Sequence, residues 1–245
     1  FQDRLVRWDG SSLQPLATGM ETSVSHLELA SNGDLLLAGW FQSMFPLGEQ
    51  RVTRWDGASW SQLNWAPFNQ QYALVGSLAS GPANDVVVTG YFLDAVSLDP
   101  ESVLRWNGSS WTGLGLLSGA AHDVVVATNG DIYIVGDFTG IEGVAANNIA
   151  RFDGTSWNSV GFGVAGLLRR VMVLRDGTVV AFGDSAWRFD GTTMQAFGAF
   201  AAGDEPDGAI ELPNGDLIVH GSLTSVAGVA VANMARFDGT SWSAY

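Results

Sequence analysis

The side chains that could carry acid–base or metal chemistry are few and widely spaced in this sequence. Three histidines, His26, His122 and His220, lie in separate segments, and none belongs to a His-x-His or His-Glu-x-x-His pattern. We expect core or turn positions for them, with a shared metal site as the alternative. Cysteine is absent, which excludes disulfides, thiol nucleophiles and thiolate metal ligands. The sequence also contains no nucleophile elbow, phosphate-binding loop or dinucleotide fingerprint.

Acidic residues dominate the charge, and one acidic cluster has the chemistry of a calcium site. Asp204, Glu205 and Asp207 offer hard oxygen ligands, but their spacing matches no defined calcium loop. We therefore expect a solvated turn and no cofactor, with calcium as the alternative. The chain has 25 acidic and 11 basic residues, a formal net charge of −14. This balance argues against nucleic acid and anionic membrane surfaces as partners, and no apolar run is long enough to insert into a membrane.

Loop residues form a second set of candidates, for binding rather than catalysis. Five positions directly follow a repeated glycine and differ in chemistry: Trp40, Tyr91, Asp137, Asp184 and Ser222. A position held in register yet varied in type is a candidate contact with a ligand or partner. Trp65 and Phe68 lie outside the repeated motifs, and exposed aromatic rings there could stack on sugars or a protein partner. The alternative is that all these residues only begin or anchor loops.

The elements that position these candidates come from two repeated motifs. The first reads Arg-aromatic, Asp-Gly or Asn-Gly, two small residues, and usually Trp. It occurs six times, beginning at Arg7, Arg54, Arg105, Arg151, Arg188 and Arg236. Asp-Gly and Asn-Gly suit the positive φ angles of a type I′ turn, so each copy predicts a two-stranded hairpin. Because a ligand site seldom needs six identical copies, we expect each arginine to form an ion pair or backbone brace beside its turn.

The second motif lies between successive copies of the first. It consists of an apolar run, a turn of the Asn-Gly-Asp type and a second apolar run ending at Gly39, Gly90, Gly136, Gly183 or Gly221. Apolar runs on both sides of a turn predict strands buried on both faces. One period of about 45 residues then holds four antiparallel strands, which is the blade of a β-propeller. In the third full period we place the strands near 122–127, 131–138, 148–152 and 156–160.

The predicted fold is an all-β propeller of four-stranded antiparallel blades, forming a single domain over residues 1–245. The favoured count is six blade positions with the first incomplete: a half blade at 1–20, then blades at about 21–66, 67–117, 118–162, 163–199 and 200–245. Five blades plus an extra hairpin is the alternative. Because an open strand edge promotes association, we expect either that this chain is a fragment of a longer polypeptide or that a partner supplies the missing hairpin.

The repeats resemble those of kelch and galactose-oxidase-like β-propellers. Residues 129–157, NGDIYIVGDFTGIEGVAANNIARFDGTSW, are most similar to the NGDLYVGGDFT…IARWDGxxW repeats of long secreted bacterial proteins. The resemblance covers the whole chain and is closest there and in 214–242, although only one of the two kelch glycines is kept. It implies a propeller with binding loops and no particular chemistry. Galactose oxidase activity is not expected, because its Tyr–Cys cross-link requires a cysteine.

These observations predict a non-catalytic interaction scaffold in a larger extracellular or cell-surface protein or assembly, with the periplasm as the alternative location. The expected partners are other protein chains or the remaining parts of a longer chain, with glycans as a further class. A lectin-like carbohydrate-binding module is the first alternative function. An enzyme acting on polysaccharide through paired loop carboxylates is the second.

Overall fold

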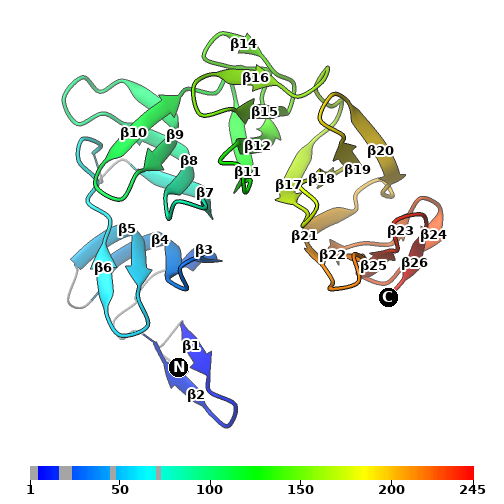
Figure 1. The fold of residues 1–245 in the computed structure, drawn as a ribbon, viewed down its shortest axis with the longest axis horizontal. Coiled ribbons are helices and arrows are strands. Elements are labelled where there is room, and N and C mark those ends of the chain that lie inside the picture. Colours follow the sequence, from blue (N-terminus) through cyan, green and yellow to red (C-terminus); the bar gives the residue numbers. More distant parts are fainter. Residues whose placement is uncertain (1–4, 17–23, 45–47, 70–72) are drawn as a thin grey trace. The chain divides into compact units, whose positions relative to one another are not determined.

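The computed structural model describes residues 5–16, 24–44, 48–69 and 73–245, with the side chains of 40–44 and 48–50 also left out (Figure 1). Within these ranges the chain forms only strands, bridges, turns and bends. It divides into two compact units, Phe1–Leu116 and Leu117–Tyr245, which are described separately. That residues 1–245 form one domain remains a prediction.

The first unit holds a hairpin and two four-stranded blades. The hairpin consists of β1 (Val6–Trp8) and β2 (Leu13–Pro15). Blade 1 consists of β3 (Val24–Leu29), β4 (Leu35–Met44), β5 (Gly48–Trp55) and β6 (Trp60–Gln62). Blade 2 consists of β7 (Leu74–Ser80), β8 (Val86–Leu93), β9 (Pro100–Trp106) and β10 (Trp111–Gly115). All neighbouring strands in these sheets are antiparallel, and each blade is a simple meander.

The second unit holds three blades. Blade 3 consists of β11 (Ala120–Val126), β12 (Ile132–Asp137), β15 (Ile149–Phe152) and β16 (Trp157–Ser159). Blade 4 consists of β17 (Leu168–Val173), β18 (Val179–Gly183), β19 (Ser185–Phe189) and β20 (Met194–Ala199). Blade 5 consists of β21 (Glu205–Glu211), β22 (Leu217–Ser222), β25 (Met234–Phe237) and β26 (Trp242–Ala244). Two small hairpins, β13 (Gly140–Ile141) with β14 (Val144–Ala145) and β23 (Ser225–Val226) with β24 (Val229–Ala230), interrupt blades 3 and 5.

The β-propeller class and its four-stranded antiparallel blades are confirmed. The strands of blade 3 lie within two residues of their predicted bounds. The blade count follows the alternative, five blades plus a hairpin. The favoured six-blade count is not supported, because β1 and β2 pair only with each other among the described residues.

The second strands contain the longest runs of buried residues among the described side chains. Ile132, Ile134 and Val135 of β12 are fully buried, since neighbouring strands cover both edges and apolar side chains cover both faces. The first strand differs from the prediction of burial on both faces. Most residues of β11 are only half-buried, because this strand forms one edge of its sheet.

The turns between the third and fourth strands also differ from the prediction. The last paired residues in blade 3 are Phe152 and Trp157, so the loop has four residues rather than two. Gly154 has a φ of 95°, but Asp153 is not among the residues with positive φ, which excludes a type I′ turn. The Asp153 carboxylate instead accepts the backbone N–H groups of Thr155 and Ser156, at 2.9 Å each. The loop is therefore ordered by an aspartate cap.

Candidate functional site

The repeated arginines form ion pairs, but with a different partner from the aspartate beside them. Four of them bond through Nε to the aspartate that precedes the second strand, 20 residues earlier: Arg54–Asp34 at 3.3 Å, Arg105–Asp85 at 2.7 Å, Arg151–Asp131 at 2.8 Å and Arg236–Asp216 at 2.6 Å. The bond from Arg236 is the main cause that lowers the pKa of Asp216. Within the described residues, Arg7 and Arg188 make no ion pair. In blade 4 the reason is that Thr178 replaces the aspartate.

The aspartate next to each arginine has a separate structural task. In blade 3 the side chain of Thr155 and the backbone N–H groups of Thr155 and Ser156 hold the pKa of Asp153 well below its usual range. Asp9, Asp56, Asp190 and Asp238 cap their own turns in the same way. These carboxylates stay ionised and engaged at neutral pH, so they are poorly suited to act as general acids or bases.

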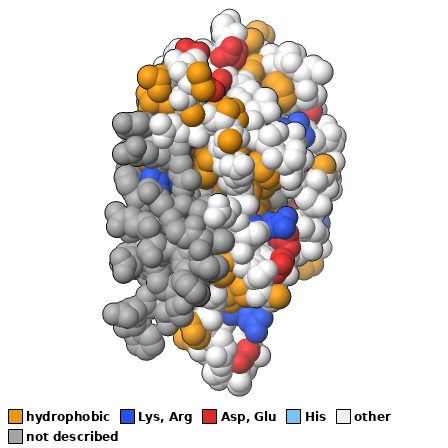
Figure 2. Space-filling model, turned by 90° about the vertical axis from the view of Figure 1, so that its left-hand side faces the viewer, with side chains coloured by type: hydrophobic (Ala, Val, Ile, Leu, Met, Phe, Trp, Pro, Cys, Tyr) orange, Lys and Arg blue, Asp and Glu red, His pale blue; other side chains and the backbone are white. Residues whose placement is uncertain are grey.

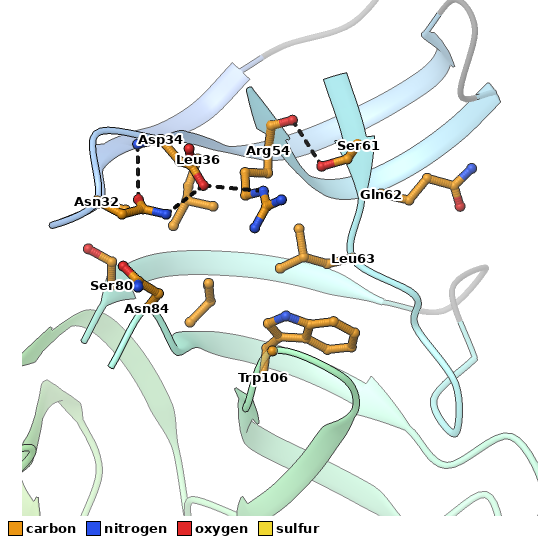
Figure 3. Close-up of a pocket in the computed structure, with 13 residues that line it drawn as sticks. Asn32, Asp34, Leu36, Arg54, Ser61, Gln62, Leu63, Ser80, Asn84 and Trp106 are labelled. Carbon is orange, nitrogen blue, oxygen red and sulfur yellow. Dashed lines mark hydrogen bonds and ion pairs between the residues drawn. The ribbon is translucent and has the colours of Figure 1, made fainter. Parts of the chain in front are cut away.

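A pocket of about 170 Å³ lies between blades 1 and 2, inside the first unit (Figure 3). Its polar lining comes from both blades: Asn32, Asp34, Arg54, Ser61, Gln62, Ser80 and Asn84. Leu63 and Trp106 lie across the pocket from Arg54, whose guanidinium points inward (Figure 3). The Arg54 side chain is 46% exposed, and its ion pair with Asp34 is the longest of the four. The pocket therefore offers a guanidinium that its own ion pair holds loosely.

The pocket exists because two side chains are smaller here than at the matching interface of blades 3 and 4. Leu36 pairs with Arg54 as Tyr133 pairs with Arg151. Ser80 likewise corresponds to Val173, since they pair with Val86 and Val179 at the same turn. In blades 3 and 4, Tyr133 and Val173 join one apolar cluster, and Tyr133 packs on Phe189 at 6.4 Å. The same position is thus core in one interface and a pocket in the other.

Asn84 gives the pocket an unusual wall. It has a φ of 58° at a turn position where the other blades have Gly33, Gly130, Gly177 and Gly215. Asparagine tolerates this left-handed conformation better than most residues, yet glycine would be easier. Its side-chain oxygen accepts a hydrogen bond from Ser31 Oγ at 3.2 Å, which links the turns of the two blades. Compared with the glycine of the other blades, Asn84 adds an amide group to the pocket wall, but its left-handed backbone conformation is less favourable than it would be for glycine.

The chemistry of this pocket favours binding over catalysis. Its single carboxylate, Asp34, already accepts hydrogen bonds from Arg54 and from Asn32 Nδ2 at 2.8 Å. The lining contains no histidine and no second carboxylate, so it lacks the acid–base pair of a glycosidase. Its volume lies below the ~300–1,000 Å³ of most small-molecule sites. It can accommodate one side chain or a terminal carboxylate that accepts hydrogen bonds from Arg54.

Trp65 and Phe68, the aromatic candidates for stacking on a ligand or partner, are not exposed. Both are buried in the core cluster of the first unit. The Trp65 ring stacks on Trp111 at 4.9 Å and on Phe92 at 6.0 Å, so it is not available for stacking on a sugar. Their remaining surface borders a shallow depression of about 350 Å³ next to the exposed Val96.

The residues after the repeated glycines mostly lie at the surface. Tyr91, Asp137, Asp184 and Ser222 are exposed. Asp184 Oδ2 accepts the Leu167 N–H at 3.1 Å, so this side chain at least braces a loop. The side chain of Trp40 lies outside the described residues. That these positions contact a ligand or partner remains a prediction.

Two of the candidate calcium ligands, Asp204 and Glu205, bond to protein groups through their carboxylates. Asp204 is buried and accepts the N–H groups of Thr224 and Ser225 as well as the Thr224 hydroxyl. Glu205 Oε1 bonds to Arg169 at 2.7 Å. The described part of the chain contains no group of three acidic or histidine side chains that could hold a metal ion. The expectation of no cofactor, with calcium at Asp204, Glu205 and Asp207 as the alternative, remains a prediction.

The described histidines lie on different strands, as expected. His122 Nδ1 lies 2.9 Å from the Leu168 carbonyl oxygen of the next blade, which is a structural contact between first strands. His220 is exposed on β22 and borders Gly208.

The basic side chains on one face of the molecule lie apart from one another (Figure 2). On the face shown in Figure 2, basic side chains lie singly, beside acidic ones, rather than in a continuous patch. The described residues include no helix with the length and hydropathy needed to cross a bilayer.

Comparisons with known proteins support the fold. A family model described as a domain of unknown function (DUF5122) β-propeller matches residues 127–155. No curated protein matches the sequence. Among solved structures, a streptogramin B lyase has a TM-score of 0.65 at 9% identity, covering 98% of this chain and 75% of that chain. A structure described as YCF48 bound to D1 peptide has a TM-score of 0.56 at 14% identity, covering 93% and 69%. A gluconolactonase from Xanthomonas campestris has a TM-score of 0.57 at 14% identity, covering 86% and 72%. At such identities these likenesses show the fold alone.

Proposed function

We propose that this chain is a non-catalytic β-propeller that serves as an interaction scaffold in a larger extracellular or cell-surface assembly. Its pocket between blades 1 and 2 would anchor a segment of a partner protein. The observation that carries the proposal is the half-exposed Arg54 guanidinium in a cavity that the matching interface of this same chain fills with Tyr133 and Val173.

The chemistry of the pocket defines the anchor group. Arg54 supplies charge-assisted donors, which favour a carboxylate or another strong acceptor. Asn84, Gln62 and Ser80 can supply further hydrogen bonds. At about 170 Å³ the cavity takes one side chain or chain end, which suits a hot-spot contact within a larger interface. A propeller structure with a bound peptide among the similar folds supports a peptide-like partner.

The alternative functions receive less support. The lectin-like function depended on exposed aromatic rings, and Trp65 and Phe68 are in the core. The polysaccharide-active enzyme needed paired loop carboxylates, and neither this pocket nor the depression beside Val96 contains such a pair. Lyases and a gluconolactonase share the fold, but at identities that carry no activity to this chain.

The proposal is tested by filling the pocket with residues that the chain itself uses elsewhere. A displayed peptide library would be selected on the wild-type protein, and enriched peptides would be measured by calorimetry. We expect Leu36→Tyr with Ser80→Val, and separately Arg54→Gln, to weaken the selected peptides by about tenfold or more, since one charged anchor carries about 1.4 kcal/mol or more. Arg151→Gln is the matched control, because the same motif there lies beside a filled interface.

Two results would contradict the proposal. Peptides that bind the filled variant as well as the wild type would show that the pocket is not the anchor. A library that yields no binder, together with a glycan array that gives specific binding lost in Trp40→Ala, would replace this proposal with the lectin-like alternative.

A further inference from the structure

The hairpin β1–β2 is held as the outer half of a blade. Trp8 pairs with Leu13 as Phe152 pairs with Trp157 in blade 3. The hairpin is fixed to blade 1 by Trp60, whose Nε1–H donates to the Leu16 carbonyl at 3.0 Å. Trp242 of blade 5 makes the equivalent bond to Phe197 of blade 4, at 2.8 Å. Leu5 adds an apolar contact beside Leu37.

This hairpin differs from the five complete blades in two respects: the edge of β1 that faces away from β2 has no neighbouring strand among the described residues, and its apolar side chains are exposed. In every blade the third strand pairs with both the second and the fourth strand, whereas β1 pairs only with β2 in the described part of the chain. Trp8 is 60% exposed and Leu13 is 61% exposed. Their counterparts in blade 3, Phe152 and Trp157, are 9% and 6% exposed. The hairpin thus presents a row of backbone groups and a bare apolar surface.

We infer that β1 accepts an extended strand from another protein chain, and that this strand reads Asp followed by three aliphatic residues. The complete blades show what fits this edge. In four of them an aspartate directly precedes the second strand, mainly aliphatic residues follow it, and its carboxylate bonds to the arginine that corresponds to Arg7: Asp34, Asp85, Asp131 and Asp216.

The register defines the incoming strand residue by residue. Ile132, Tyr133 and Ile134 of blade 3 lie opposite Phe152, Arg151 and Ala150. The first aliphatic residue of the partner would therefore cover Trp8, the second would lie opposite Arg7, and the third would cover Val6. The aspartate in front would reach the Arg7 guanidinium. Backbone hydrogen bonds supply affinity in such strand addition, and the side chains supply specificity.

Charge disfavours a second copy of β1 as the occupant. An antiparallel pair of two β1 strands in register would place Arg7 close to Arg7 of the other copy, and like charges across a strand pair are destabilising. A strand carrying aspartate replaces that repulsion with an ion pair. A strand of this kind from another protein therefore fits the edge better than a second copy of this chain does. The inference is independent of the pocket between blades 1 and 2, which lies on other strands.

A peptide from the chain itself provides the probe. A fluorescein-labelled peptide with the sequence of residues 120–137 contains the first two strands of blade 3, including Asp131. Fluorescence anisotropy would follow its binding to the folded protein, up to about 1 mM peptide. We expect saturable binding that Arg7→Glu weakens about tenfold or more. A peptide with Asp131→Arg should bind the Arg7→Glu protein better than it binds the wild type.

Control variants separate binding at β1 from binding at the pocket and from a loss of folding. Arg188→Glu changes the same motif position inside a complete blade and should leave binding unchanged. The pocket-filled variant, Leu36→Tyr with Ser80→Val, should also bind the strand peptide normally, so failure of one proposal leaves the other standing. Circular dichroism would confirm that Arg7→Glu, which alters an exposed side chain, retains the fold.

Three results would overturn the inference. The first is an absence of saturable binding. The second is equal weakening by Arg7→Glu and Arg188→Glu. The third is concentration-dependent dimerisation in sedimentation experiments that an excess of the strand peptide abolishes, which would assign the edge to a second copy of this chain.

Discussion

The ion pair between the second and third strands gives a quantitative prediction, because the chain carries its own natural variant. Asp131 is buried and accepts hydrogen bonds from Arg151 Nε at 2.8 Å and Asn129 Nδ2 at 2.9 Å. Blade 4 has Thr178 at this position. Asp131→Thr therefore transfers the arrangement of blade 4 to blade 3, with little change in the local turn.

The expected loss of unfolding free energy depends on how deeply Asp131 and Arg151 are buried. Hydrogen bonds to charged groups contribute about 1.5–3 kcal/mol each when well buried. The Arg151 side chain is 35% exposed, so solvent screens the pair and lowers its contribution. We expect Asp131→Thr to reduce the free energy of unfolding by about 1–2 kcal/mol. The reverse change, Thr178→Asp, should add at most about 0.5 kcal/mol, because Arg188 is exposed.

Urea unfolding followed by tryptophan fluorescence would measure both changes through the shift of the midpoint at a constant slope. Asp137→Thr is the matched control, since it makes the same substitution at an exposed position at the end of the same strand. The reasoning would be refuted if Asp131→Thr lay within about 0.3 kcal/mol of the wild type. It would also fail if Asp137→Thr had the same effect as Asp131→Thr.

Three further predictions concern the turns, the core and a glycine. Hydrogen bonds lower the pKa of Asp153, so its stabilising contribution is complete above the unfolded value near 3.9 and is lost as the pH falls below it. Blade 2 has Asn107 at this turn position. Replacing all five turn aspartates with asparagine should make the melting temperature fall less steeply between about pH 4 and pH 2 than it does in the wild type. The same fall in melting temperature in both proteins would contradict this. Trp65→Ala should cost about 3–5 kcal/mol in chemical unfolding, because its ring stacks on Trp111, whereas a cost below about 1 kcal/mol would indicate a surface role. Gly136→Ala should cost about 1–3 kcal/mol, because the added Cβ would lie 2.1 Å from the Ala120 carbonyl oxygen; Gly130→Ala at an open turn separates this clash from a purely conformational penalty.

The repeats were sufficient to predict the blade and its strands, because each blade repeats the same two turns and the same apolar runs. The type of the second turn was predicted wrongly. Asp-Gly suits a type I′ turn, but the hydroxyl residues that follow let Asp153 cap a wider loop. The small hairpins β13–β14 and β23–β24 were not anticipated, although Gly143 and Gly228, with φ of 77° and 81°, mark their turns.

The site could not be predicted from the motifs alone. The partner of Arg151 depends on strand register, which places Asp131 closer than the neighbouring Asp153. Predicting the pocket requires a comparison of Leu36 with Tyr133 at equivalent positions of two blades. These positions can be matched only when the strand registers are known. The burial of Trp65 could not be predicted from the motifs either, because it depends on Trp111 in the next blade.

The central claim, that this propeller holds a partner protein, is tested most directly by native mass spectrometry of the protein from its natural source, with the denatured mass measured beside it. The scaffold function predicts a native mass larger than the denatured mass of this polypeptide, because a second kind of protein chain remains bound. A native mass equal to the denatured mass of the same polypeptide would contradict it.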